Sequence, residues 1–509
     1  MRLRSPLVTL LALALAGLAS TQVLAGLDAD VPPPAAPPKD PEARRQWLKA
    51  RLDEIVASQP LAKAKLSIAV MDPETGKLVY AKNERTGLNA ASNVKIATEV
   101  AALSILGPEF RWKTTVLAAT PSDGGKAIAN GEVRGDLYVK TSGDPSLSTQ
   151  DLNSLASTLY AFGLRKVRGG LVVDSSAFDG GALPPAFDQK DDSAAFRAPS
   201  SAASLNGNTV TVTITPAASA GAPARTSLDP ASAALTVSGT VTTAAKGPAS
   251  IAIETADAGN GQTKVTVAGR IVLGSEPRVF QRRVATPETY FAQSFRQILS
   301  KRGITIDRPA RAGDAPKEGL HILASHESPN LAVVVQDLGK RSSNFAAEQL
   351  LRTLGGENLG RPGTWQKGLE AVARYLEGIG IPRGSYVMKN GSGLYDSNRF
   401  SADQIVQILR AATRDFRIAS EFLASLAVGG ADGTLAHRML GSAAERFVRA
   451  KTGTLANVSC LSGIVGAPAT KPLVFSILVN DVASPVAARA AQDLITAAIV
   501  TYLDPALAK

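Results

Sequence analysis

Apolar side chains recur every three or four positions near both ends of the chain, which is the spacing of one face of an α-helix. At the N-terminal end this pattern predicts a helix over residues 41–59. Two apolar runs around a polar turn at residues 72–76 then predict a hairpin over residues 65–83. The Ala-rich segment 88–103 predicts a second helix, which is apolar almost throughout.

A different pattern fills residues 113–305, where short runs rich in Val and Thr alternate with Gly, Pro, Asn and Asp. Such runs predict β-strands separated by turns. One helix, over residues 152–163, interrupts them. We therefore expect an inserted, mostly β region made of two modules. Its strands are predicted at residues 111–119, 135–140, 208–216, 233–243, 250–256 and 263–273.

Helical spacing returns after the inserted region, and the chain then closes with three apolar runs typical of strands and a last helix. Together with the opening hairpin, the three strands predict one five-stranded antiparallel sheet flanked by helices, an α+β (α/β mixed) fold. This domain is expected to consist of two segments, residues 42–112 and 306–509. The helices are predicted at residues 288–303, 330–356, 364–380, 401–413 and 485–503, and the strands at residues 446–454, 457–466 and 472–481.

Residues 1–25 have the pattern of a cleaved secretory signal peptide. Two arginines precede a short apolar run, and Val23 and Ala25 give the small-x-small cleavage pattern. The apolar run is shorter than the ~20 residues that a membrane span needs. Residues 26–41 form a Pro-rich linker. The sequence therefore predicts export to the periplasm or another extracytoplasmic space.

Charge narrows the possible partners. The chain has a formal net charge of +11, which becomes +9 without the signal peptide and its two arginines. No block of Lys and Arg with interleaved aromatic residues is present, so we expect no nucleic-acid partner. The positive sign suits an anionic cell-wall polymer or peripheral association with a membrane surface. Cys460 is the only cysteine, so no intrachain disulfide can form.

Candidate chemistry begins with Ser92 and Lys95, which lie three positions apart near the start of the predicted helix 88–103. This spacing places both side chains on one face. A serine becomes a nucleophile when a base takes its proton, and a lysine is such a base when burial and a second cation lower its pKa. The alternative is a polar helix start with Ser92 as its N-cap.

The second cation is expected to be Lys451, in the chain's single Lys-Thr-Gly at the end of a predicted strand. Gly453 would allow a substrate backbone to lie against the strand edge, and Thr452 and Thr454 are candidates to hold a carboxylate. The backbone N–H groups of Ser92 and Thr454 are candidates for an oxyanion hole. The alternative for the Lys-Thr-Gly is an ordinary strand that ends in a turn.

A Ser-x-Asn pattern occurs at residues 204–206, 328–330 and 342–344. The first enters a β run and the second has the form of a helix cap, whereas the third lies between two helical segments of the predicted sheet domain. There, Ser342 is a candidate to pass a proton to a leaving amine, and Asn344 to hold a substrate amide. An N-cap is the alternative for Ser342.

The order Ser-x-x-Lys, Ser-x-Asn, Lys-Thr-Gly is typical of serine β-lactamases and penicillin-binding proteins. With several further segments, the chain resembles the D-alanyl-D-alanine carboxypeptidase/endopeptidase family, the low-molecular-mass class C penicillin-binding proteins. The resemblance covers nearly all of the mature chain, including roughly 250 residues between the first two motifs. The segments that carry it are residues 131–147, 169–180, 390–401, 429–435 and 450–463.

This resemblance implies a serine β-lactamase/transpeptidase-like fold and a serine-type D-Ala-D-Ala carboxypeptidase and DD-endopeptidase. Such an enzyme cuts peptidoglycan stem peptides through an acyl-enzyme, and β-lactam antibiotics inhibit it covalently. The resemblance implies that Ser92 is the nucleophile and Lys95 the general base, with Ser342, Asn344 and Lys451 as the other catalytic residues. The implied substrate-binding residues are Thr452, Gly453 and Thr454.

One departure from the family concerns Tyr395 and Asp396, which stand where members commonly have Ser-Arg after Gly-Ser-Gly-Leu. That Arg helps some members to hold the substrate's side chain, so the side-chain preference stays open here. No metal or cofactor is expected, because the three histidines lack a metal-ligand spacing. Two alternatives remain: a β-lactamase, which differs in its fast deacylation, and a catalytically silent cell-wall-binding scaffold of the same fold.

Overall fold

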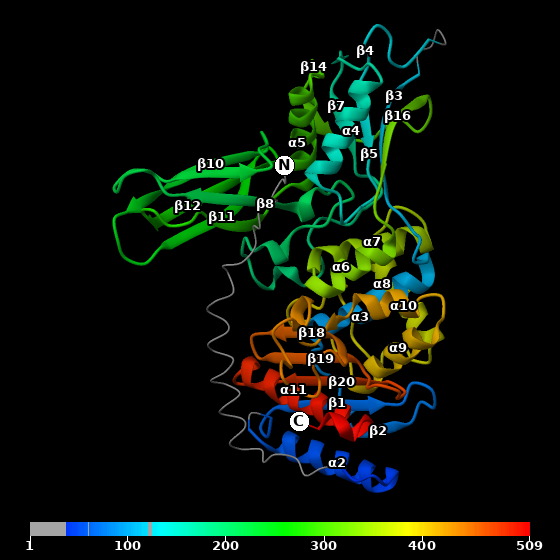
Figure 1. Cartoon of the computed structure of the whole chain (residues 1–509). Coiled ribbons are helices and arrows are strands. Elements are labelled where there is room, and N and C mark those ends of the chain that lie inside the picture. Colours follow the sequence, from blue (N-terminus) through cyan, green and yellow to red (C-terminus); the bar gives the residue numbers. More distant parts are fainter. Residues whose placement is uncertain (1–36, 60, 121–124, 509) are drawn as a thin grey trace, which may run out of the picture.

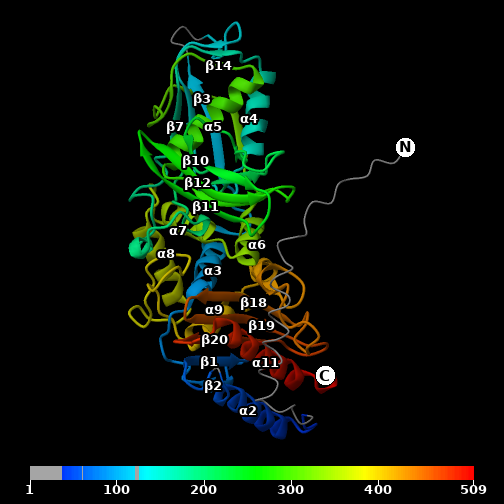
Figure 2. The ribbon, with the colours of Figure 1, turned by 90° about the vertical axis from the view of Figure 1, so that its left-hand side faces the viewer.

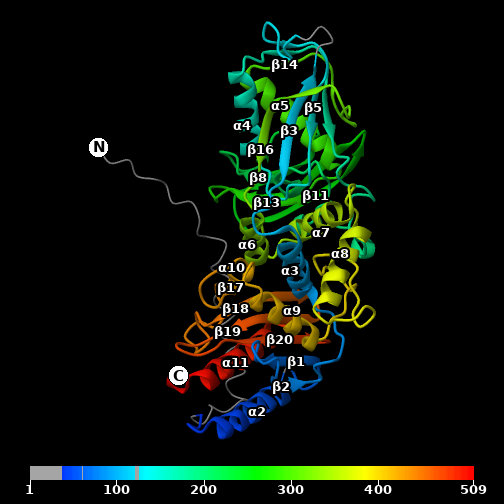
Figure 3. The ribbon, with the colours of Figure 1, turned by 90° about the vertical axis from the view of Figure 1, so that its right-hand side faces the viewer.

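The computed structural model of this protein describes residues 37–59, 61–120 and 125–508. The predicted signal peptide, residues 1–25, and residues 26–36 of the predicted linker lie outside the described residues. The chain forms two stacked bodies (Figure 1), a lower one built from both ends of the chain and an upper one built from its middle. Two side views show the same stacking (Figures 2 and 3).

Six strands form the sheet of the lower body, in the order β17-β18-β19-β20-β1-β2, and all neighbours are antiparallel. The prediction of a five-stranded antiparallel sheet is confirmed, and a two-residue strand at one edge adds a sixth. Because β1 pairs with β20, the N-terminal hairpin lies beside the C-terminal strands. The strands are β1 (Lys65–Met71), β2 (Leu78–Lys82), β17 (Ala427–Val428), β18 (Val448–Leu455), β19 (Val458–Val465) and β20 (Leu473–Asn480).

Both faces of this sheet are buried, which explains why its central strands are apolar almost throughout. Successive side chains of a strand point to opposite faces. On β20, Val474 and Leu478 therefore join the core around α3, whereas Phe475 and Ile477 join the core under the terminal helices. The two cores share the sheet as their common wall.

Helices cover each face of the sheet. One face is covered by α2 (Pro41–Ala57) and α11 (Pro485–Leu503), and the other by α3 (Val94–Leu106) and α9 (Ala402–Arg414). By length and composition, α11 is the one helix of the described chain that could cross a membrane. In this fold its apolar face is part of the core.

Helix α3 runs through the middle of the lower body, and its residues from Val94 to Leu103 are all buried. The helical stretch predicted over residues 330–356 consists of two helices that meet at the Ser-x-Asn of residues 342–344, as the sequence led us to expect. Ser342 adopts a left-handed conformation with φ of 58°, which ends the first helix, and Ser343 caps the second. The helices around α3 are α6 (Leu331–Arg341), α7 (Asn344–Leu359), α8 (Trp365–Gly378) and α10 (Ala419–Ser425).

The upper body contains a mixed five-stranded sheet in the order β15-β7-β5-β3-β16, together with α4 and α5 and three sheets of three strands each. The larger sheet and its helices are β3 (Lys113–Ala119), β5 (Leu137–Lys140), β7 (Leu171–Asp174), β15 (Ala310–Ala312), β16 (Leu320–Glu327), α4 (Thr149–Ala161) and α5 (Pro287–Arg302). The smaller sheets contain β4 (Glu132–Val133), β6 (Lys166–Val167) and β14 (Thr305–Ile306); β8 (Thr209–Thr215), β9 (Arg225–Asp229) and β13 (Arg278–Arg283); and β10 (Leu235–Ala244), β11 (Ser250–Gly259) and β12 (Gln262–Val272).

The expected boundary between residues 305 and 306 does not fit this pairing. Strand β15 pairs with β7, and β16 pairs with β3, so residues 310–327 belong to the sheet of the upper body. The chain returns to the lower body at α6. Strand β16 was not predicted, because it has only two buried residues and therefore lacks a clear alternation of apolar and polar positions.

The shared sheet makes a stability prediction. Ile477 is 0% exposed between strands β19 and β1, so Ile477→Ala should leave a cavity and lower the free energy of unfolding by about 2–5 kcal/mol. Ile322 is 61% exposed on β16, and Ile322→Ala should change it by less than about 0.5 kcal/mol. Urea unfolding followed by circular dichroism measures both. Equal losses in the two variants would contradict the buried sheet.

Candidate active site

A cavity of about 840 Å3 opens where the two bodies meet, and four of the predicted site residues line it. They are Ser92 on the 3-10 helix η1 (Ala91–Asn93), Ser342 and Asn344 at the junction of α6 and α7, and Thr454 on β18. The two predicted lysines, Lys95 and Lys451, are 0% exposed. The structure therefore gathers residues from distant parts of the chain at one place.

Two asparagines fix the turn that carries Ser92. Asn89 Oδ1 accepts a hydrogen bond from the backbone N–H of Ala91 at 2.9 Å, which supports the left-handed backbone there. Asn93 Nδ2 donates to the carbonyl of Lys451 at 3.0 Å and so ties the turn to β18. The N-cap position of α3 is Asn93 and not Ser92, so the cap alternative for Ser92 is wrong.

The amine of Lys95 lies 2.9 Å from Ser92 Oγ. It also contacts Asn344 Oδ1 at 2.8 Å and the carbonyl oxygen of Ser392 at 2.6 Å. These last two oxygens can only accept hydrogen bonds. A neutral lysine has two N–H hydrogens and one lone pair, so the two oxygens take both hydrogens. The lone pair then faces Ser92 and is placed to accept its proton.

The orientation of Asn344 is set from the upper body. Its Nδ2 donates at 3.0 Å to the carbonyl of Phe196, on η3 (Ala195–Arg197). Because a carbonyl only accepts, the amide must present Nδ2 to Phe196 and Oδ1 to Lys95. Arg197 is 2% exposed and donates to two carbonyls of the same loop at 2.7 and 2.8 Å. The inserted region thus positions the side chain that directs the Lys95 hydrogens.

Electrostatics favour a neutral Lys95. Burial lowers the pKa of Lys95 well below its ordinary value, since a charged amine loses its hydration there. The positive charge of Lys451 lowers this pKa further. Two carboxylates, Glu348 and Glu99, act in the opposite direction. Lys451 is therefore the second cation that a basic amine at position 95 requires.

Lys451 has its own partners. Its Nζ donates to Ser342 Oγ at 2.6 Å and to the carbonyl of Thr452 at 2.9 Å. Burial lowers the pKa of Lys451 to about 8, so the amine is charged at neutral pH. Since Ser342 Oγ accepts from this cation, its own hydrogen is free to go to a ligand. The N-cap alternative for Ser342 is wrong, because Ser343 Oγ accepts from Ala346 N at 3.1 Å.

Two buried carboxylates near the lysines were not predicted. Glu348 accepts from the backbone N–H groups of Ser392 at 2.8 Å and Gly391 at 3.1 Å, so it holds the loop whose carbonyl binds Lys95. Glu99 lies one turn after Lys95 on α3, and burial raises its pKa to about 7. Glu99 is the single acid of the apolar helix α3, and this isolation is the signal that could have identified it.

Strand β18 offers a free edge beside Ser92. Strand β17 pairs with β18 only at residues 449 and 450, so residues 451–455 have no strand neighbour on that side within the described chain. An extended peptide can add to such an edge. Gly453 also makes room for the Ser92 turn, because a Cβ there would lie 2.9 Å from Ala90 O.

The two threonines of β18 have the same orientation, because they are two residues apart on a strand. Of the two, Thr454 lines the cavity, and its Oγ1 accepts from Arg489 Nη2 at 3.3 Å. Thr452 Oγ1 lies 2.9 Å from the hydroxyl of Thr434. Arg489 lies on α11, far from every motif, so no sequence pattern pointed to it.

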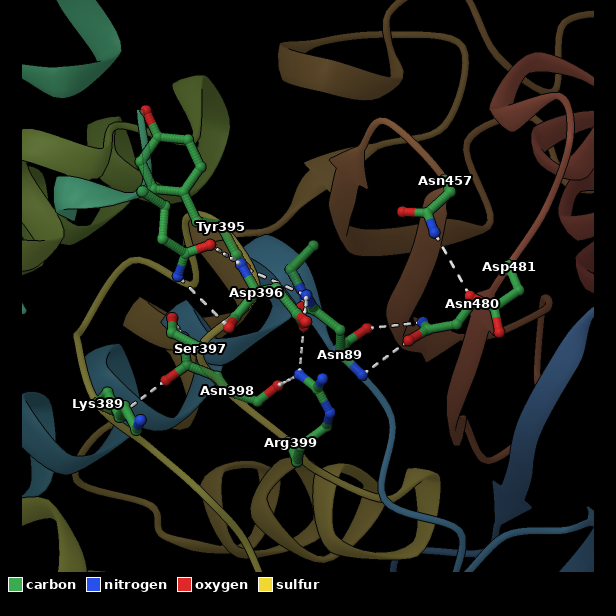
Figure 4. Close-up of polar contacts among 12 residues, drawn as sticks. Asn89, Lys389, Tyr395, Asp396, Ser397, Asn398, Arg399, Asn457, Asn480 and Asp481 are labelled. Carbon is green, nitrogen blue, oxygen red and sulfur yellow. Dashed lines mark hydrogen bonds and ion pairs between the residues drawn. The ribbon is translucent and has the colours of Figure 1, made fainter. Parts of the chain in front are cut away.

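A polar wall, formed by Asn89, Asp396 and Arg399, borders the cavity on another side (Figure 4). Asp396 binds Arg399 at 2.6 Å and accepts from Asn89 Nδ2 at 3.1 Å. The hydrogen bond from Arg399 holds the pKa of Asp396 below its usual range. Asp396 occupies the position at which members of the family commonly have an arginine. This position thus carries a carboxylate, and the nearby Arg399 is bound to it.

Comparisons with known proteins identify the family and the fold of the chain. Residues 48–501 match the model of the D-Ala-D-Ala carboxypeptidase 3 (S13) family. The chain is 34% identical over 474 residues to a D-alanyl-D-alanine carboxypeptidase from Actinomadura sp. (strain R39), covering 90% of this chain and 86% of that one. It is 27% identical over 388 residues to D-alanyl-D-alanine carboxypeptidase DacB of Haemophilus influenzae, covering 75% and 78%. The crystal structure of penicillin binding protein 4 (dacB) from Haemophilus influenzae has the same fold, with a TM-score of 0.75 at 23% identity over 87% of this chain and 97% of that one.

Proposed function

Since the chain belongs to the D-Ala-D-Ala carboxypeptidase 3 (S13) family, we propose that Ser92 is the nucleophile with which this serine-type D-Ala-D-Ala carboxypeptidase cuts peptidoglycan stem peptides. One observation carries the proposal: the Lys95 amine lies 2.9 Å from Ser92 Oγ. Lys95 is the general base in this proposal. Ser342, Asn344 and Lys451 complete the catalytic set, and the strand motif of β18 binds the substrate.

Acylation begins when Ser92 Oγ attacks the carbonyl carbon of the penultimate D-alanine and Lys95 Nζ takes the serine proton. Negative charge then develops on the carbonyl oxygen, where the backbone N–H groups of Ser92 and Thr454 stabilise it. The free edge of β18 holds the substrate backbone in line with the attack. No group has to move far, because the base and the nucleophile are already within hydrogen-bond distance.

The bond between the carbonyl carbon and the leaving nitrogen breaks once that nitrogen gains a proton. Ser342 supplies the proton and recovers one from Lys451, whose Nζ lies 2.6 Å away. The proton taken by Lys95 then restores the Lys451–Ser342 pair, so Lys95 is neutral again. The terminal D-alanine leaves as a free amino acid, and the rest of the peptide stays on Ser92 as an ester.

Deacylation repeats the same chemistry with water. Lys95 takes a proton from a water molecule that attacks the ester carbonyl, and Ser92 Oγ regains a proton as the ester bond breaks. A β-lactam can acylate Ser92 by the same attack, and its amine remains tethered after ring opening. Slow hydrolysis of the covalent adduct distinguishes this enzyme from a β-lactamase, in which deacylation is fast.

The proposal extends to DD-endopeptidase action on cross-linked stem peptides and to a periplasmic or other extracytoplasmic location. The cavity supports the first, because it continues from Ser92 along the polar wall as far as Lys65 and Asp481. The pattern of residues 1–25 supports the second. A net charge of +9 for the chain without that segment suits the anionic cell wall.

Benzylpenicillin tests the nucleophile. Intact-protein mass spectrometry should show one penicillin per chain, and Ser92→Ala should show none because the attacking oxygen is gone. Ser154→Ala is the matched control, since Ser154 is an exposed serine of α4 in the upper body. An adduct on the Ser92→Ala variant would refute the assignment. Loss of the wild-type adduct within seconds, with many turnovers, would favour the β-lactamase alternative.

The two lysines predict a bell-shaped pH dependence for the acylation rate. The rate should fall toward acid pH, because Lys95 becomes protonated and can no longer take the Ser92 proton. The pKa of Lys451 is lowered to about 8, so above that pH the amine loses its proton and the rate should fall again. Stopped-flow acylation by a chromogenic cephalosporin between pH 5 and 10 measures both limbs, with circular dichroism as the control for folding. A rate that stays level from pH 7.5 to 9.5 would contradict the role of Lys451.

A further inference from the structure

Arg489 approaches the cavity from the terminal helix. It lies near the start of α11, is half-buried, and its Nη2 donates to Thr454 Oγ1 at 3.3 Å. A guanidinium has only donors, so the hydroxyl of Thr454 must be the acceptor in this contact. The hydrogen of that hydroxyl therefore remains available to a negatively charged group in the cavity.

The charge of Arg489 is not neutralised by a direct partner. No carboxylate of the described residues forms an ion pair with it, and its neighbour Arg438 takes Asp493 at 2.6 Å. Arg438 also donates to the backbone carbonyl of Arg489 at 3.1 Å. Within the described chain, Asp493 thus pairs with Arg438 and leaves Arg489 without an acid of its own. This corner of the site therefore carries an excess positive charge beside Thr454.

Two other cations that line the cavity are held by carboxylates, whereas a third, Lys190, forms no ion pair with the described residues. Lys65 pairs with Asp481 at 2.9 Å, and Arg399 pairs with Asp396 at 2.6 Å. Lys451 is buried and donates to a hydroxyl and a carbonyl. Arg489 is the guanidinium nearest to Thr454, and it has no carboxylate partner among the described residues. An anion that reaches Thr454 would therefore be attracted by its charge.

The reaction itself brings an anion to this point. If the carbonyl oxygen of the scissile bond faces the N–H groups of Ser92 and Thr454, the next residue of the substrate lies along β18. A carboxylate on that residue is three bonds from the scissile carbon, or about 4 Å away. It would lie against Thr454 Oγ1, with the Arg489 guanidinium directly behind that hydroxyl.

We propose that Arg489 selects substrates whose leaving residue carries a free α-carboxylate, and rejects those in which this group is amidated or esterified. The inference rests on the proposed function, since it assumes that Ser92 attacks the neighbouring carbonyl. Arg489 acts in two ways: it supplies attractive charge, and it turns the Thr454 hydrogen toward the carboxylate. It is a specificity residue and takes no part in the bond-making steps.

The test compares two peptides that differ only in the group at issue, a stem-peptide mimic ending in D-Ala-D-Ala and the same peptide with a C-terminal amide. In Arg489→Gln, kcat/KM for the free acid should fall about tenfold, mainly through KM, because one charge-assisted contact is lost. The already low rate on the amide should not change. The ratio of the two rates should therefore fall about tenfold.

Matched variants separate this role from a structural one. Arg374→Gln removes an exposed arginine of α8 and should leave both rates unchanged. If Arg489→Gln does not fold, as judged by circular dichroism, Arg489→Met keeps the apolar stem and removes the charge, and the same ratio is expected to fall. An unchanged ratio in either folded variant, or equal losses on both peptides, would overturn the inference. If the wild type hydrolyses neither peptide and takes no penicillin, the proposed function fails instead.

Discussion

The rest of the structure depends on two buried lysine amines, of which only one is charged. Lys95 and Lys451 are both 0% exposed, and the charge of the second lowers the pKa of the first. Burial makes a second positive charge costly, so the proton resides on Lys451 and the lone pair on Lys95. The surrounding oxygens that can only accept hydrogen bonds then fix the direction of each hydrogen.

Much of the fold serves to hold these few atoms. The sheet brings β18 from the C-terminal part of the chain against the Ser92 turn, and Gly453 lets the two approach closely. Glu348 steadies the loop whose carbonyl binds Lys95. The upper body contributes the carbonyl of Phe196, which keeps the Asn344 amide in one orientation. The inserted region is therefore more than a spacer, because it reaches the proposed catalytic centre.

The sequence was most informative where chemistry depends on side chains at short, fixed spacing. Ser92 and Lys95, the Ser-x-Asn at 342–344 and the Lys-Thr-Gly at 451–453 could all be found this way, and the short apolar runs near both ends of the chain predicted the sheet. Phe196 could not be found, because it acts through a backbone carbonyl, which every residue has. Strand β16 was missed because it lies at an edge with two buried positions, and its pairing with β3 depends on chain path and not on composition.

The contact between Asn93 and the carbonyl of Lys451 joins residues that are 358 positions apart. A ribosome must synthesise almost the entire polypeptide before this tie can form. Until then Ser92 is an ordinary alcohol, since no cation depresses the basicity of the adjacent amine and no strand edge awaits a peptide. In the proposed mechanism, a chain that ends before Lys451 is therefore expected to form no acyl-enzyme.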